Sequence, residues 1–159
     1  MYYSFYSSPF GEIALTASDD GLTALAFQQG SAPLDISAQY CQNTDIFKQV
    51  HLQLDEYFAG QRTVFDLPLA PQGTPFQQKV WQALTTIKQG ETKSYAWLAE
   101  KINNTKAVRA VGTANGANPI ALIIPCHRVI GSNGKLTGYA GGLALKAKLL
   151  MHEKAQFNV

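Results

Sequence analysis

A proline-rich segment, LPLAPQGTP at residues 67–75, divides the chain into two halves of opposite charge. Residues 1–73 carry two basic and eight acidic side chains, a net charge of −6, whereas residues 74–159 carry eleven basic and three acidic ones, a net charge of +8. Because closely spaced prolines interrupt helices and sheets, we expect a linker between two small domains, residues 1–73 and 74–159. The basic second domain suits a nucleic-acid partner, although the two charges could also neutralise each other across an internal interface.

The composition, 46% hydrophobic and 15% charged, is typical of a globular protein. No apolar run approaches the ~20 residues that span a bilayer, and the opening residues, MYYSFYSSPF, lack the basic and apolar regions of a signal peptide. We therefore expect a cytoplasmic protein without a membrane partner.

The two cysteines, Cys41 and Cys126, stand in unlike surroundings, so no disulfide is expected. Cys41 and His51 are too few for a zinc site, and we expect no metal.

Two alternating apolar stretches predict an antiparallel sheet in the first half. EIALTAS (12–18) and LTALAFQ (22–28) flank an Asp-Gly pair that is typical of a hairpin turn. Apolar and aromatic side chains then recur with helical spacing between residues 46 and 58, and Gly60 follows as a stop. TVFDL, residues 63–67, is predicted to form a further strand. Nothing in this half indicates catalytic chemistry.

The second half begins with a well-delimited helix and continues with a helix-turn-helix pattern. Thr74 is a favourable N-cap, Pro75 suits the first helical position, and apolar residues follow on one face. Ser94 is expected to cap a short helix, YAWLAEKI, and Thr105 to cap a second one that runs over residues 106–116. Two helices joined by a tight polar turn are typical of proteins that bind DNA.

The predicted helix at 106–116 is unusually rich in small residues, with Arg109 as the one long side chain in its middle. The small residues in and just after it are Ala107, Ala110, Gly112, Ala114, Gly116 and Ala117. Such a helix has a narrow face that could enter the minor groove of DNA, which is only ~6 Å wide. A tightly packed core helix explains the same composition equally well.

The run NPIALIIPCHRVI, residues 118–130, is predicted to be a buried strand that carries a Cys-His-Arg triplet. A free cysteine has a pKa of about 8.5, so only about 3% is thiolate at pH 7, and a nucleophilic Cys126 needs a base or a positive charge nearby. His127 and Arg128 are the adjacent candidates. Neighbouring residues of a strand point to opposite faces, so Cys126 and His127 can cooperate only through a turn or a bridging water.

Glu153, expected in the final turn of the last helix, is a candidate to orient the imidazole. We therefore expect a relay from Glu153 through His127 and a water molecule to Cys126. The alternative is a structural cysteine, because free cysteines are among the most buried residues.

The sequence resembles the family of O6-alkylguanine-DNA alkyltransferases, also called methylated-DNA–protein-cysteine methyltransferases. The resemblance rests on Ile-Pro-Cys-His-Arg-Val at residues 124–129, preceded by Asn118 at the interval usual for the family. It extends over residues 74–159 through the segments SYAWLA, KAVRAVG, GKLTGYAGG and LLMHE. The first half agrees with the family only in its size and in the proline-rich linker at its end.

The resemblance implies that Cys126 accepts an alkyl group from O6-alkylguanine, and also from O4-alkylthymine, in double-stranded DNA. The transfer would be irreversible and would need no cofactor. His127 and Glu153 would activate Cys126 through water, and Asn118 would support the active-site turn. Tyr95 would help to rotate the target phosphate and would supply a proton to the departing guanine.

The resemblance also implies a DNA contact surface and a base pocket. Arg109 would fill the gap that remains when the target nucleotide is flipped out. The other expected DNA contacts are Ala107, Ala110, Thr113, Arg128 and Tyr95. The residues expected to form the pocket are Tyr139, Ala140, Val129, through its backbone, and Lys146. Relatives often carry Ser or Arg where this chain has Ala140, so we expect one hydrogen bond fewer to the base and a roomier pocket.

For the fold, the resemblance implies an α+β protein of two domains. The first would be a ribonuclease H-like α/β domain and the second a winged-helix domain that contains the helix-turn-helix. We expect a monomer.

Two other functions remain open. A cysteine hydrolase could use Cys126, His127 and Glu153 through an acyl-enzyme, but it leaves the helix-turn-helix unexplained. A non-catalytic protein could recognise alkyl lesions, but it would not require the reactive cysteine.

Overall fold

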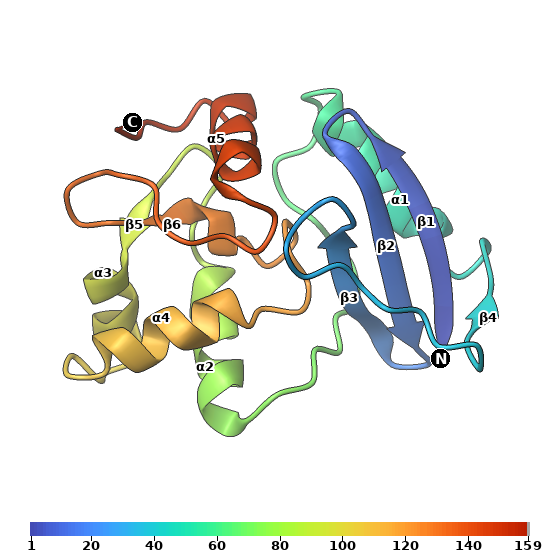
Figure 1. Ribbon diagram of the computed structural model, residues 1–159, viewed down its shortest axis with the longest axis horizontal. Coiled ribbons are helices and arrows are strands. Elements are labelled where there is room, and N and C mark those ends of the chain that lie inside the picture. Colours follow the sequence, from blue (N-terminus) through green and yellow to red (C-terminus); the bar gives the residue numbers. More distant parts are fainter. Residues whose placement is uncertain (159) are drawn as a thin grey trace.

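The computed structural model describes residues 1–158 and has a mixed α/β fold. Figure 1 shows a sheet with one helix in the N-terminal half and a group of short helices in the C-terminal half. This architecture confirms the expectation that the protein combines helices and strands in a mixed α/β fold. No helix among residues 1–158 is long and apolar enough to cross a membrane.

The N-terminal half is built on a four-stranded sheet with the order β3-β2-β1-β4. Its strands are β1 (Tyr2–Ser8), β2 (Gly11–Ser18), β3 (Gly21–Phe27) and β4 (Cys41–Gln42). The first three are antiparallel neighbours, whereas β4 runs parallel to β1. The predicted hairpin is confirmed as β2 and β3. Strands β1 and β4 were not predicted.

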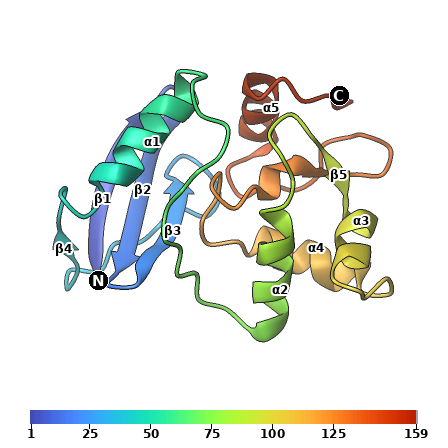
Figure 2. The same ribbon diagram turned by 180° about the vertical axis from the view of Figure 1, so that it is seen from behind.

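Helix α1 (Lys48–Phe58) packs across one face of the sheet, as Figure 2 shows from behind, and it confirms the predicted helix. Its buried side chains join those of the inner sheet face in the core. The strand predicted at residues 63–67 is wrong. The backbone of Asp66 instead bonds to a side chain of α1, because its N–H donates to Gln53 Oε1 at 2.9 Å and its carbonyl accepts from Gln53 Nε2 at 3.0 Å.

Over residues 74–158 the C-terminal half forms four α-helices and a two-stranded parallel ribbon. These elements are α2 (Pro75–Leu84), β5 (Lys93–Ser94), α3 (Tyr95–Lys101), α4 (Val108–Gly116), β6 (Val129–Ile130) and α5 (Leu143–His152). The predicted caps at Thr74 and Ser94 are confirmed, since Thr74 forms a capping box with Gln77 and Ser94 Oγ accepts from the Trp97 amide. The cap at Thr105 is wrong, because α4 begins only at Val108 and has no side-chain cap.

The run at residues 118–130 is not the predicted strand. Leu122 adopts a positive φ of 72°, and the Ile124 amide donates to the Ile120 carbonyl at 3.0 Å, so the chain folds back before it reaches Cys126. Cys126–Arg128 then form a 3₁₀ turn, and only Val129–Ile130 are extended in a sheet. Cys126 and His127 were expected to need either a turn or a bridging water in order to cooperate. The structure has such a turn at these two residues.

The two halves meet through one continuous hydrophobic core and through backbone hydrogen bonds at the edge of β3. The Leu25 amide donates to the Pro119 carbonyl at 2.9 Å, and the Ala121 amide donates to the Leu25 carbonyl at 3.1 Å. The segment that leads to Cys126 is thus attached to the N-terminal sheet. Any displacement of this sheet edge would shift the segment that carries the cysteine.

Candidate active site

Cys126 is buried and lines a cavity of about 260 Å³. The preceding turn is held by the amide group of Asn118. Its Nδ2 donates to the Ile124 carbonyl at 2.7 Å, and its Oδ1 accepts from the Ile120 amide at 3.0 Å. Asn118 thereby fixes the backbone that presents the thiol to the cavity.

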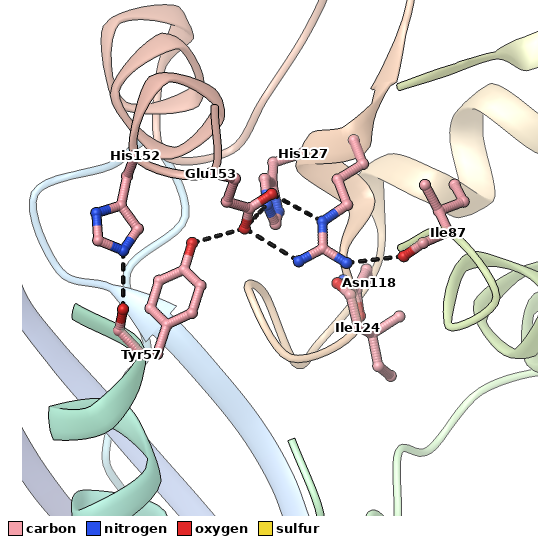
Figure 3. Close-up of polar contacts among 8 residues, drawn as sticks. Tyr57, Ile87, Asn118, Ile124, His127, His152 and Glu153 are labelled. Atoms are coloured by element: carbon pink, nitrogen blue, oxygen red, sulfur yellow. Dashed lines mark hydrogen bonds and ion pairs between the residues drawn. The ribbon is translucent and has the colours of Figure 1, made fainter. Parts of the chain in front are cut away.

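His127 and Glu153 lie together in the protein interior, as Figure 3 shows. His127 Nε2 is 2.9 Å from Glu153 Oε2. An ionised carboxylate can only accept hydrogen bonds, so Nε2 must carry the proton in this contact. Nδ1 then remains an acceptor, and it has no hydrogen-bond partner among residues 1–158. The imidazole is therefore oriented by Glu153 and has one nitrogen free to take up a proton.

Glu153 directly follows α5 and holds three buried side chains at once. Besides His127, it accepts from Arg128 Nε at 2.8 Å and Nη2 at 3.1 Å, and from the Tyr57 hydroxyl at 2.6 Å. Burial acts to raise the pKa of the Glu153 carboxyl. The contacts with His127 and Arg128 outweigh burial and hold this pKa well below its usual range, so the group is ionised at neutral pH.

The structure corrects the prediction that Arg128 contacts DNA. Arg128 is only 6% exposed, and its Nη1 donates to the Ile87 carbonyl at 2.7 Å while the rest of its guanidinium binds Glu153. A guanidinium so fully engaged in the interior cannot reach a phosphate. Its position next to His127 in the sequence did not reveal this, because the side chain turns toward α5.

Tyr57 is a site residue that the sequence did not indicate. It lies on α1 in the N-terminal half, is 1% exposed, and reaches Glu153 from across the junction between the halves. The His152 ring bonds to the Tyr57 carbonyl at 2.8 Å, so α1 and the end of α5 are joined twice (Figure 3). In the sequence Tyr57 fits the apolar spacing of a core helix, and no signal distinguishes its hydroxyl.

Burial and the polar groups near the Cys126 thiol act on its pKa in opposite directions. Burial raises the pKa of Cys126 and outweighs the neighbouring Asn118 amide and the Lys146 ammonium, which lower it, so the free thiol needs a base to ionise at neutral pH. Lys146 is fully buried, donates to the Thr137 carbonyl at 2.7 Å, and has its pKa lowered to about 8 by burial. Burial also lowers the pKa of His127, so its ring is neutral at pH 7 and can act as a base.

The cavity beside Cys126 has walls from both halves of the chain. The N-terminal wall consists of Leu25, Ala26, Phe27, Ala32 and Leu34. From the C-terminal half, Tyr139 and Ala140 line it as expected from the sequence, together with Asn115, which the sequence did not indicate. The Tyr139 hydroxyl and Asn115 Oδ1 are buried without a hydrogen-bond partner in the described part of the chain. Both polar atoms therefore have unused hydrogen-bonding capacity in side chains that line the cavity.

Two other predicted pocket residues lie outside this lining. Val129 is fully buried in β6 and is not part of the lining, so the role expected of its backbone stays a prediction. Lys146 is not part of the lining either. Its ammonium group donates to the Thr137 carbonyl, and its charge lowers the pKa of the Cys126 thiol. No three His, Cys, Asp or Glu side chains within residues 1–158 form a group that could hold a metal ion.

The helix-turn-helix presents a narrow exposed face next to the cavity. Arg109, Ala110 and Thr113 are exposed on α4, and Ala107, directly before it, is partly exposed. On the inner side, Trp81 Nε1 donates to the Ala114 carbonyl at 2.9 Å and fixes the helix to α2. A second, more open hollow of about 650 Å³ extends from α4 past Tyr95, whose hydroxyl is 2.8 Å from Thr137 Oγ1. This hollow shares Tyr139 and Ala140 with the inner cavity and so leads toward Cys126.

Two family models match the chain in succession. Residues 1–71 match the ribonuclease-like domain of 6-O-methylguanine DNA methyltransferase, and residues 75–155 match its DNA binding domain. The two matches together cover almost the whole chain.

Individual relatives agree with these matches. The chain is 49% identical to the methylated-DNA–protein-cysteine methyltransferase of Methanosarcina acetivorans over 153 residues, which cover 96% of this chain and 98% of that protein. It is 46% identical to the constitutive methylated-DNA–protein-cysteine methyltransferase of Bacillus subtilis, covering 98% of this chain and 97% of the relative. The crystal structure of Mycobacterium tuberculosis OGT in complex with DNA is similar with a TM-score of 0.90 and 45% identity, over 97% of this chain and 93% of that one.

Proposed function

This chain belongs to the 6-O-methylguanine DNA methyltransferase family, and on that premise we propose that Cys126 is its alkyl acceptor. The protein repairs alkyl lesions in DNA directly, by transfer of the alkyl group to one of its own cysteines. The observation that carries the assignment is the position of Cys126 on a cavity beside a buried, neutral histidine. Cys41, by contrast, is exposed on β4. The proposed substrate is double-stranded DNA that carries O6-alkylguanine, and also O4-alkylthymine.

In the first proposed step Cys126 transfers its proton to His127. Because Nε2 of the ring donates to Glu153, the acceptor is Nδ1, and a single water molecule carries the proton from Sγ to this nitrogen. Glu153 stabilises the imidazolium that forms, as the carboxylate of a catalytic triad does. The Lys146 ammonium stabilises the thiolate.

In the second step the thiolate attacks the saturated carbon that is bound to O6 of the guanine. A sulfur–carbon bond forms while the carbon–oxygen bond breaks, and the bonding electrons leave with O6. The departing base takes up a proton, which we assign to the Tyr95 hydroxyl at the mouth of the site. The product is a thioether that water does not cleave at neutral pH, so each molecule reacts once and needs no cofactor.

The proposed DNA surface is the exposed side of α4. Ala107, Ala110 and Thr113 let the helix approach the minor groove closely, and Arg109 occupies the gap left by the flipped nucleotide. The flipped base enters between Tyr139 and Ala140. Burial raises the pKa of Tyr139 well above its usual range, so this hydroxyl stays protonated and can donate to the base.

The finer organisation of the protein is part of the same proposal. We assign residues 1–73 to a domain with a ribonuclease H-like arrangement and residues 74–159 to a winged-helix domain. The family matches to residues 1–71 and 75–155 and the proline-rich segment between them support this division. We further propose that the protein acts as a monomer in the cytoplasm.

Intact-protein mass spectrometry in the presence of excess duplex with one O6-methylguanine tests this function. Wild type and a Cys41→Ser variant should each gain the mass of one CH₂ group and then stop, whereas Cys126→Ser should gain nothing. Continued turnover without a gain in mass would favour a hydrolase. Tight binding of the lesion by wild type with no gain in mass would favour a recognition protein.

A further inference from the structure

The Gln28–Leu34 segment, which follows β3 in the N-terminal half, forms part of the wall around the reactive cysteine. Ala32 and Leu34 line the inner cavity, and Ala32 also lines the outer hollow that begins at α4. Figure 1 shows this segment beside the chain that leads into α5. A group that moves from the surface of α4 to Cys126 therefore passes this segment.

The segment is bound directly to the turn that contains Ala140. The Ser31 amide donates to the Ala140 carbonyl at 2.7 Å, and the Ser31 hydroxyl donates to the same oxygen at 2.8 Å. Gly30 packs against this turn so closely that a Cβ atom would lie 2.6 Å from the Ala140 oxygen and 2.7 Å from Gly141 Cα. A side chain at position 30 would thus force the two segments apart.

The segment is also tied at both ends, which fixes its position. Gln28 Nε2 donates to the Leu34 carbonyl at 3.1 Å, and Gln28 Oε1 accepts from the Leu34 amide at 2.9 Å. At its start, the Gln28 amide donates to the Glu12 carbonyl of β2 at 2.8 Å. The loop is therefore closed by its own side chain and anchored to the sheet, so it cannot easily move aside for a larger substrate.

We propose that the Gln28–Leu34 segment determines which O6 substituents the site accepts, by fixing the Ala140 turn and lining the cavity with Ala32 and Leu34. This inference rests on the proposed function and adds a specificity role for the N-terminal half. The alkyl group must lie next to Sγ inside the cavity during transfer, so the fixed apolar wall limits its size. Hydrophobic pockets discriminate in this way by about 10- to 200-fold for a single methylene group.

The test compares single-turnover transfer from two duplexes, one with O6-methylguanine and one with O6-benzylguanine. Ala32→Phe places a larger side chain at an exposed position of the wall and narrows the cavity. The ratio of the benzyl transfer rate to the methyl transfer rate should fall about tenfold or more. Leu34→Ala shortens a side chain of the wall and widens the cavity, so the same ratio should rise. Ala38→Phe is the matched control, because Ala38 is also exposed but lines neither hollow, and its ratio should equal that of wild type.

The outcomes separate this inference from the function on which it rests. A ratio in Ala32→Phe equal to that of wild type, including an equal loss of both rates, would overturn the inference while leaving the proposed function in place. Failure of wild type to accept an alkyl group from either duplex would instead refute the function. Melting temperatures of the variants show whether each is folded, and Ala32→Phe decides the question if Leu34→Ala is unstable.

Discussion

The two halves of this chain contribute to one site in different ways. The C-terminal half supplies the groups that react in the proposed mechanism, and its contacts with the substrate come from the helix-turn-helix, the motif around Cys126 and the turn with Tyr139 and Ala140. The N-terminal half supplies support, through the backbone of Leu25, the hydroxyl of Tyr57 and the loop that holds Ala140. The proposed reacting groups therefore all belong to the C-terminal half, whereas part of the support that positions them comes from the N-terminal half.

The largest expected effect comes from Glu153→Gln, where the two halves meet. The change leaves the buried Arg128 guanidinium without its counter-charge, so the free energy of unfolding should fall by about 3 to 5 kcal/mol. Transfer should also slow strongly, because His127 loses its orienting carboxylate. Denaturant unfolding and single-turnover kinetics measure the two effects. Glu56→Gln, which removes the partly exposed pair with Arg62, is the control and should change stability by less than about 1 kcal/mol.

Acidification should reproduce part of this loss without a mutation. The pKa of Glu153 is held low in the folded protein, so its contribution to stability is present above its unfolded pKa of about 4.3 and is lost as the pH falls below it. The pKa of buried His127 is also lowered, so the unfolded chain binds this proton first and stability should begin to decline below about pH 6.5. Unfolding free energies between pH 8 and pH 3 check both declines. Constant stability across that range would contradict the description of the buried cluster.

Tyr57→Phe tests the support from the N-terminal half with the loss of one oxygen atom. The hydrogen bond to the Glu153 carboxylate is buried and charge-assisted, so we expect a loss of about 1.5 to 3 kcal/mol in stability. The pH dependence of transfer should also shift, because Glu153 influences the pKa of His127. Tyr6→Phe removes a similar bond to Asp55 on the surface and should leave the pH profile unchanged. Identical profiles for wild type and Tyr57→Phe would confine Tyr57 to a structural role.

Arg109→Ala tests the C-terminal half alone and should have the smallest effect on folding. Arg109 is exposed on α4, so stability should hardly change, while transfer from duplex DNA should fall about tenfold or more through lost contacts. Transfer from the free base O6-benzylguanine should stay at the wild-type rate, since no nucleotide has to be flipped. Arg62→Ala is the control in the acidic half. Equal losses with duplex and free base would argue against a role of Arg109 in flipping.

The sequence was informative where structure depends on local contacts. Thr74 and Ser94 cap their helices through neighbours three residues away, and the predicted hairpin turns at Asp19–Asp20 directly before Gly21, so these elements were predictable. Residues 118–130 have strand composition, but the positive φ of Leu122 and the contacts of Asn118 fold the chain back, and Cys126–Arg128 then form a 3₁₀ turn. The buried position of Arg128 depends on Glu153, which is distant in sequence.

The same distinction applies to the candidate site. The Cys-His pair and Glu153 could be proposed from residue types and from the family resemblance, and the structure brings His127 and Glu153 into contact. Tyr57 and Asn115 could not be found in this way, because a tyrosine on a core helix and an asparagine near a helix end are ordinary residues. The contacts of Leu25 and Gly30 involve backbone atoms and leave no signal in side-chain chemistry.

Peptide mapping of the wild-type protein after reaction with a duplex carrying one O6-methylguanine tests the central assignment most directly. We predict a single added methyl group per protein molecule, located on the peptide that contains Cys126, with the peptide of Cys41 unchanged. A methyl group on Cys41, or removal of the lesion without any methyl group on the protein, would contradict the account.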